Sequence, residues 1–157
     1  MTTPILCATD LSETSRPALN EALRLASSLR APLSVLFVAP PPYPNPDYLS
    51  LAASNQAVLE TTAERLRSVT QARLEDMVQG AKCALGLEHV PTRAVVREGT
   101  PAETILREAE AEQAELIVVG THARTGLPHL LLGSVAERVI RTARQPVLTV
   151  APWSRSG

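Results

Sequence analysis

Residues 115–137 read ELIVVGTHARTGLPHLLLGSVAE, and this stretch contains the pattern that decides the fold. An apolar run at 116–119 ends at Gly120, a loop follows, and Gly133 and Ser134 begin a second apolar-periodic segment that is typical of a helix. The stretch therefore predicts a strand, a loop bounded by glycines and a helix N-terminus. Such a terminus suits an anion, because its first N–H groups are unpaired and lie at the positive end of the helix dipole. A plain loop and a capped helix would explain the same residues without a ligand.

The rest of the chain continues this strand and helix pattern in strict alternation. Apolar runs predict strands at 5–8, 33–39, 92–96, 116–119 and 146–150. Four helices are predicted between them. The first begins in the polar cluster at 12–17, the second covers 59–81, the third begins at Pro101 and the fourth covers 134–143. Alternation of this kind predicts one doubly wound α/β domain across residues 1–157, with a parallel sheet and helices on both faces.

Apolar spacing also predicts which helix faces are buried. The first helix is expected to bury Ala18, Ala22, Leu25 and Leu29. The second is expected to be long and amphipathic, to use its single methionine as core filler, and to end between Gly80 and Gly86. Its predicted inner face comprises Leu59, Ala63, Leu66, Thr70, Leu74, Met77 and Ala81.

Two helix starts carry the signature of a capping box. Thr100 is the predicted N-cap of the third helix, with Pro101 at its first position and Glu103 as the return partner. Ser134 and Glu137 have the same spacing in the fourth helix, which explains both residues without a ligand. The alternative is that the Ser134 hydroxyl or N–H binds a phosphate.

Two segments are expected to lie outside the regular structure. The proline-rich residues 40–46 predict a stiff, extended start to a long loop over residues 40–55. This loop is interpreted as a variable connector, with a lid or a partner-recognition segment as the alternative. Residues 153–157 predict a flexible tail, and Trp153 either packs near the last strand or belongs to that tail.

Composition narrows the classes of partner. The chain has 157 residues, and its 15 Lys and Arg nearly balance its 16 Asp and Glu, so nothing favours nucleic acid or an anionic membrane. No apolar run is long enough to span a bilayer and no signal pattern opens the chain, which predicts a cytoplasmic protein. Cys7 and Cys83 have no metal-ligand or redox spacing and are expected to be reduced packing residues. No catalytic or metal-ligand set is evident.

The predicted topology places a site. In an open parallel sheet, ligands bind beyond the carboxyl ends of the strands, where the winding direction reverses. Asp10, Val38 and Gly120 follow or end three predicted strands, so they are expected to line one crevice, with the loop 120–133 as its wall. Asp10 has three possible roles: a hydrogen bond to a nucleoside, support of a divalent cation through water, or a cap on the first helix. The P-loop and dinucleotide glycine motifs are absent, so neither of those enzyme classes is expected.

The same stretch resembles the universal stress protein family, whose nucleotide-binding members carry G-x2-G-x9-G-S/T between the fourth strand and the fourth helix. Here the motif reads Gly120, Ala123, Gly133 and Ser134 at that spacing. ILCATDLSE near the N-terminus, the turn 99–101, LLLGSVAERVI and PVLTVAP near the C-terminus also resemble the family. The resemblance spans the whole chain and implies five strands in the order 3-2-1-4-5, a Rossmann-like fold similar to that of adenine nucleotide alpha hydrolases, and a homodimer.

Position by position, the resemblance also implies an ATP site, with Mg²⁺ as a further expectation. Adenosine contacts fall on Ala8, Thr9, Asp10 and Val38, and ribose and phosphate contacts fall on Val119, Gly120, Ala123, Gly133, Ser134 and Val135. Within the loop, Arg124 either neutralises a terminal phosphate or is a solvated loop arginine. His122 is expected beside the phosphates, without a partner that would make it a catalytic base. The main departure is Ala123, which stands where the family motif has glycine.

These expectations lead to three functional hypotheses. The first is an ATP-binding, dimeric stress-response regulator, paired through the apolar edge strand at residues 147–150 between Pro146 and Pro152. The second is an interaction module of the same fold that binds no nucleotide because of Ala123. The third is a weak ATPase or phosphotransferase.

Overall fold

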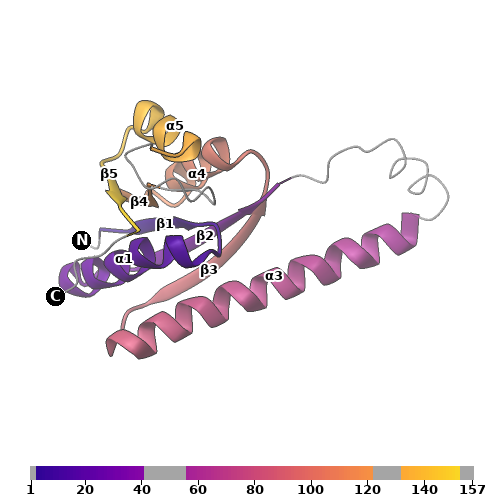
Figure 1. Ribbon diagram of the computed structural model, residues 1–157, viewed down its shortest axis with the longest axis horizontal. Coiled ribbons are helices and arrows are strands. Elements are labelled where there is room, and N and C mark those ends of the chain that lie inside the picture. Colours follow the sequence, from indigo (N-terminus) through magenta and orange to yellow (C-terminus); the bar gives the residue numbers. More distant parts are fainter. Residues whose placement is uncertain (1–2, 41–55, 122–131, 153–157) are drawn as a thin grey trace.

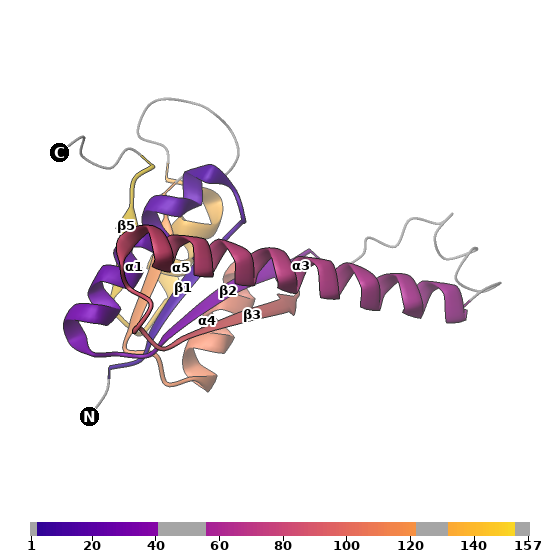
Figure 2. The ribbon, with the colours of Figure 1, turned by 90° about the horizontal axis from the view of Figure 1, so that it is seen from below.

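The computed structural model describes residues 3–40, 56–121 and 132–152 (Figures 1 and 2). The described strands form one five-stranded sheet, in which every pairing is parallel and the order is β3-β2-β1-β4-β5. The predicted fold class and strand order are therefore confirmed. The expected loop after Pro40 and the expected tail at 153–157 lie outside the described residues.

The elements begin and end close to the predicted positions. The strands are β1 (Ile5–Thr9), β2 (Leu33–Ala39), β3 (Thr92–Glu98), β4 (Leu116–Gly120) and β5 (Val147–Val150). The helices are η1 (Glu13–Ser15, a 3-10 turn), α1 (Arg16–Leu29), α3 (Gln56–Leu85), α4 (Pro101–Ala111) and α5 (Ser134–Thr142). No described helix has both the length and the apolar character that a membrane span requires.

Each face of the sheet has its own core, and alternate residues of the central strands serve the two faces. On one face, Cys7 of β1 packs with residues of α1 and α3 such as Leu23 and Leu74. On the other face, Leu6 packs with residues of α4 and α5 such as Ile105 and Val139. Figure 1 shows the two helix pairs on opposite sides of the sheet. A strand buried on both faces explains the unbroken apolar runs of the sequence.

The long helix α3 packs over only part of its length. Leu74 and Val78 are buried, whereas Leu66 is 67% exposed and Val69 is 59% exposed. The predicted inner face is therefore wrong at Leu66, whereas Ala63 and Thr70 of the same predicted face are partly buried. A helix of 30 residues is about 45 Å long, whereas a strand of 7 residues spans about 23 Å. Both views show α3 running past the sheet (Figures 1 and 2).

The buried face of α1 also differs from the predicted one. Ala18 and Ala22 are buried as expected, but Leu29 is 52% exposed and Leu25 is only partly buried. Leu19 and Leu23 fill the core instead. Apolar residues three and four apart fit two neighbouring faces of this helix. The spacing therefore predicted the helix but did not decide which of the two faces is buried.

The two cysteines occupy opposite environments. Burial raises the pKa of the Cys7 thiol to about 12, whereas Cys83 is exposed on α3, so the prediction of a packing role is wrong for Cys83.

Because the thiolate is the reactive form, we expect a thiol reagent at pH 8 to modify one cysteine in the native protein and two in denaturant. Mass spectrometry of the labelled protein counts the modified thiols. Native modification of Cys7 would contradict its burial.

Candidate functional site

A crevice opens at the carboxyl ends of the central strands, where sequence topology predicted it. Its volume is about 160 Å³, and Asp10 from β1, Val38 from β2 and Gly120 from β4 all line it. Most of its wall is apolar. The other lining residues are Ala8, Thr9, Ser15, Leu36, Phe37, Pro101, Ile105, Val119, Gly133, Val135 and Ala136.

The N-terminus of α5 forms one end of this crevice. Gly133 is the N-cap, its N–H donates to the Thr121 carbonyl (2.7 Å), and its carbonyl accepts from the Glu137 N–H (2.9 Å). Ser134 is the first helical residue and is exposed, and no described residue accepts a hydrogen bond from the N–H of Ser134, Val135 or Ala136. These three N–H groups make this end of the crevice suited to an anion.

Neither predicted capping box forms. Thr100 is the N-cap of α4 and Gly133 that of α5, and neither makes a side-chain cap hydrogen bond. The glutamates that were expected to complete the boxes pair with arginines of α5 instead, Glu103 with Arg138 at 2.8 Å and Glu137 with Arg141 at 2.9 Å. The first turns of α4 and α5 are thus both uncapped by side chains at the edge of the crevice.

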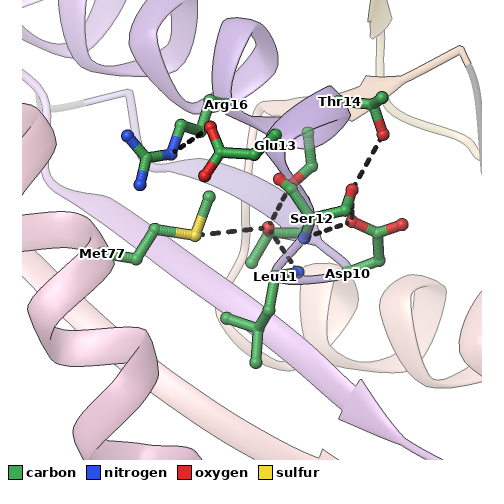
Figure 3. A network of polar contacts seen from close by, with 9 residues as sticks. Asp10, Leu11, Ser12, Glu13, Thr14, Arg16 and Met77 are labelled. Carbon is green, nitrogen blue, oxygen red and sulfur yellow. Dashed lines mark hydrogen bonds and ion pairs between the residues drawn. The ribbon is translucent and has the colours of Figure 1, made fainter. Parts of the chain in front are cut away.

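The turn from β1 to α1 fixes Asp10. One oxygen of its carboxylate, Oδ1, accepts the N–H of Ser12 at 2.9 Å and also the Ser12 hydroxyl (Figure 3). Ser15, not Asp10, is the N-cap of α1, so the expected helix-capping role of Asp10 is wrong. Because the turn uses only Oδ1, the other carboxylate oxygen has no described partner and remains available to a ligand.

The Thr9 hydroxyl is occupied by the protein itself. Its oxygen lies 2.8 Å from the Ser15 hydroxyl, accepts the Leu11 N–H at 3.1 Å and lies 3.9 Å from the Met77 sulfur. Leu11 has a φ of 64°, which costs a non-glycine residue about 1 kcal/mol or more. Thr9 therefore shapes the turn with its side chain, and its backbone is the part that remains for a ligand.

Eight of the candidate residues line this crevice, namely Ala8, Thr9, Asp10, Val38, Val119, Gly120, Gly133 and Val135. Ser134 lies in the helix turn that ends the crevice without lining it. His122, Ala123 and Arg124 lie outside the described residues. Of the described lining residues, only Asp10 is charged.

Sequence reasoning missed six lining residues: Ser15, Leu36, Phe37, Pro101, Ile105 and Ala136. Leu36 could have been found from its spacing. It lies two residues before Val38 on the same strand, and residues two apart on a strand share a face. Pro101 and Ile105 belong to α4, whose N-terminus follows the strand β3 and so reaches the same edge of the sheet.

The fold is doubly wound, and its apolar crevice lies at the switch point, where α/β proteins of this class hold small-molecule ligands. The sequence model of the "Universal stress protein family" matches residues 1–151. Universal stress protein MJ0531 of Methanocaldococcus jannaschii is 35% identical over 146 residues, with 93% of this chain and 80% of that protein covered. The chain therefore belongs to the universal stress protein family.

Two solved structures extend the comparison. MJ0577 of the same organism, also a universal stress protein, is 31% identical over 152 residues, which cover 93% of each protein. Its structure superimposes with a TM-score of 0.70 and covers 99% of both chains. A universal stress protein crystallised in complex with cAMP has the same fold, with a TM-score of 0.65 at 22% identity and coverage of 97% of this chain and 98% of the other.

Proposed function

We propose that this protein binds ATP in the crevice and acts as a nucleotide-dependent regulator. The observation that carries the proposal is an apolar crevice that ends at a helix N-terminus, where three N–H groups have no hydrogen-bond acceptor among the described residues. An apolar cavity suits the flat adenine ring, and an uncapped helix start suits a phosphate. The complex of a universal stress protein with cAMP supports an adenine nucleotide as the class of ligand.

The orientation of the nucleotide follows from the two ends of the crevice. Adenine packs between Ala8 and Val38, which line the crevice from β1 and β2. The phosphates then reach the first turn of α5, where the N–H groups of Ser134 and Val135 are expected to donate to them. Gly133 contributes close approach of its backbone rather than its N–H, since that group already donates to Thr121.

The charge of the triphosphate has to be balanced. Asp10 is negative and no described cation lines the crevice, so Mg²⁺ bound to the phosphates and Arg124 of the loop supply the positive charge in this proposal. The free oxygen of Asp10 is suited to a water of the metal's hydration shell or to a ribose hydroxyl. No group of three or more metal-ligating side chains gathers among the described residues, so the nucleotide itself would bring the metal.

Regulation is favoured over catalysis for one reason. Among the described side chains that line the crevice, none is a general base held in position by a hydrogen-bonding partner. Nucleotide occupancy would instead alter the order of the loop after Gly120 and, through it, the choice of partner.

Calorimetric titration with ATP and Mg²⁺ is the test. We expect saturable heat at one site per chain, and no heat at millimolar nucleotide would reject the binding function in favour of a nucleotide-free interaction module.

Ala123 separates the nucleotide-binding proposal from that second hypothesis. If the motif position needs only close approach of a phosphate, the natural protein and Ala123→Gly bind ATP alike. If it needs a positive φ, Ala costs about 1 kcal/mol or more, and the glycine variant gains about fivefold or more in affinity. We expect a gain below tenfold, measured by the same titration. Binding that exists only in the variant would assign the natural protein to the interaction-module class.

A homodimer through β5 is the second part of the proposal. β5 lies at one edge of the sheet, all four of its residues are partly exposed, and Pro146 precedes it. An apolar edge strand of this kind favours a twofold partner, which would cover the edge. We expect a dimer by sedimentation at micromolar concentration. A monomer under those conditions would refute the dimer without touching the nucleotide proposal.

A further inference from the structure

Met77 of α3 lies against the turn that carries Asp10, although the two elements are far apart in sequence. Its sulfur lies 3.9 Å from the hydroxyl oxygen of Thr9, which is 68 positions earlier in the chain (Figure 3). Thr9 is buried with 8% of its surface exposed, whereas Met77 is only partly buried. Met77 therefore connects the core-facing side of α3 to the residue that precedes Asp10.

The hydroxyl protons of this turn have a defined arrangement. Ser15 donates its only hydroxyl proton to the Ser12 carbonyl at 2.8 Å. The contact of 2.8 Å between the Ser15 and Thr9 hydroxyls consequently needs the proton of Thr9. The Thr9 hydroxyl is also within donating distance of the Met77 sulfur at 3.9 Å, but a thioether is a weak acceptor, so the Ser15 oxygen is the stronger acceptor for that proton.

The sulfur can be reached from solvent. Met77 lines a groove of about 330 Å³ together with Leu11, Glu13, Arg16, Arg73 and Asp76. The groove lies between the start of α1 and the middle of α3, and the Glu13 and Arg16 side chains on its rim are 81% and 58% exposed. A small oxidant such as hydrogen peroxide fits this groove.

We propose that Met77 is a reversible methionine-oxidation site that controls the nucleotide crevice. In the reaction, the sulfur forms a bond to one oxygen of hydrogen peroxide as the O–O bond breaks, which gives methionine sulfoxide and one water. The sulfur is oxidised by two electrons and the peroxide is reduced. Reductases of methionine sulfoxide reverse the change. The control of nucleotide binding rests on the function proposed above.

The effect follows from the acceptor strength of the product. A sulfoxide oxygen is a strong acceptor beside the Thr9 hydroxyl, so it competes with Ser15 for the single Thr9 proton. Loss of the Thr9 to Ser15 hydrogen bond frees the start of α1. Rotation of the Thr9 side chain toward the sulfoxide also withdraws the oxygen that accepts the Leu11 N–H, so Leu11, held at a φ of 64°, is released from a strained conformation. Asp10, which lies between Thr9 and Leu11, moves with them.

The test uses a Cys83→Ser background, because the exposed Cys83 thiol would also be oxidised. Met77→Leu in that background is the matched control, since it keeps the volume but cannot be oxidised. Both proteins are treated with hydrogen peroxide, and peptide mass spectrometry locates the added oxygen. The chain has only one other methionine, Met1, so the assignment is unambiguous. Hydrogen exchange over residues 9–16 and calorimetric titration with ATP follow before and after reductase treatment.

We expect oxygen to add to Met77 of the folded protein, exchange over residues 9–16 to rise, and ATP affinity to fall about tenfold, the cost of roughly one hydrogen bond. Treatment with methionine sulfoxide reductase should reverse all three changes. Met77→Leu should show none of them, and Met77→Gln should lower ATP affinity without any oxidant. A folded protein whose Met77 resists peroxide, or whose exchange over 9–16 is unchanged by oxidation, would overturn the inference. Absence of ATP binding before treatment would reject the proposed function, while the exchange result would still judge the oxidation site.

Discussion

Ala8→Leu is expected to raise the dissociation constant for ATP at least a hundredfold, a loss of about 2.8 kcal/mol of binding free energy. Ala8 lies in β1, lines the crevice and packs beside the core formed with α4 and α5. A leucine side chain there would occupy the space that the proposal assigns to adenine. Because the added atoms enter a crevice rather than a packed core, the free energy of unfolding should change by less than about 1 kcal/mol.

The matched control is Ala72→Leu. Ala72 is exposed on α3, outside the residues that line the crevice, so the same change of side chain should leave ATP affinity unaltered. Calorimetric titration of both variants and chemical denaturation of each give the two free energies. Wild-type affinity in Ala8→Leu would place the adenine elsewhere and contradict the proposed orientation.

Gly99→Ala is expected to destabilise the fold by about 2–3 kcal/mol. Gly99 has a φ of 150°, which side chains of L-residues rarely adopt, and a Cβ atom there would lie 2.5 Å from Oγ1 of the buried Thr104. Its N–H donates to the Ala39 carbonyl at 3.0 Å and so ties the start of α4 to the end of β2. The variant therefore strains the turn that brings Pro101 and Ile105 to the crevice.

Gly80→Ala is the control for this substitution. Gly80 lies within α3, has no positive φ, and a Cβ atom there would meet nothing within 4 Å. In a helix interior alanine is favoured over glycine, so the free energy of unfolding should rise by about 0.5–1 kcal/mol. Denaturant titrations of both variants give the comparison, and equal stability of Gly99→Ala and the natural protein would show that this turn is not constrained as described.

The fold could be predicted from sequence because its signals agree at every level. Apolar runs of strand length alternate with helical spacing throughout, and short unbroken runs of this kind are typical of strands buried on both faces. The order of the strands came from the family resemblance, and the sheet confirms it. The carboxyl ends of β1, β2 and β4 then had to meet, which placed Asp10, Val38 and Gly120 beside one crevice.

The predictions that failed share one physical cause, which is that contacts between elements distant in sequence decided the outcome. Glu103 fits a capping box by spacing, but α5 offers it Arg138 at 2.8 Å, and an ion pair between helices cannot be deduced from either helix alone. Leu66 fits the inner face of α3, but only the length of the sheet decides where that face stops being covered. The bond between the Thr9 and Ser15 hydroxyls, six residues apart in the chain, was likewise not predicted, because it depends on how the turn folds.

The central claim is that ATP occupies the crevice with its phosphates at the start of α5. A crystal structure of the protein grown with ATP and Mg²⁺ tests it most directly. We expect density for adenine between Ala8 and Val38 and for a phosphate within hydrogen-bonding distance of the N–H groups of Ser134 and Val135. An empty crevice at saturating nucleotide, or a phosphate bound away from the first turn of α5, would contradict it.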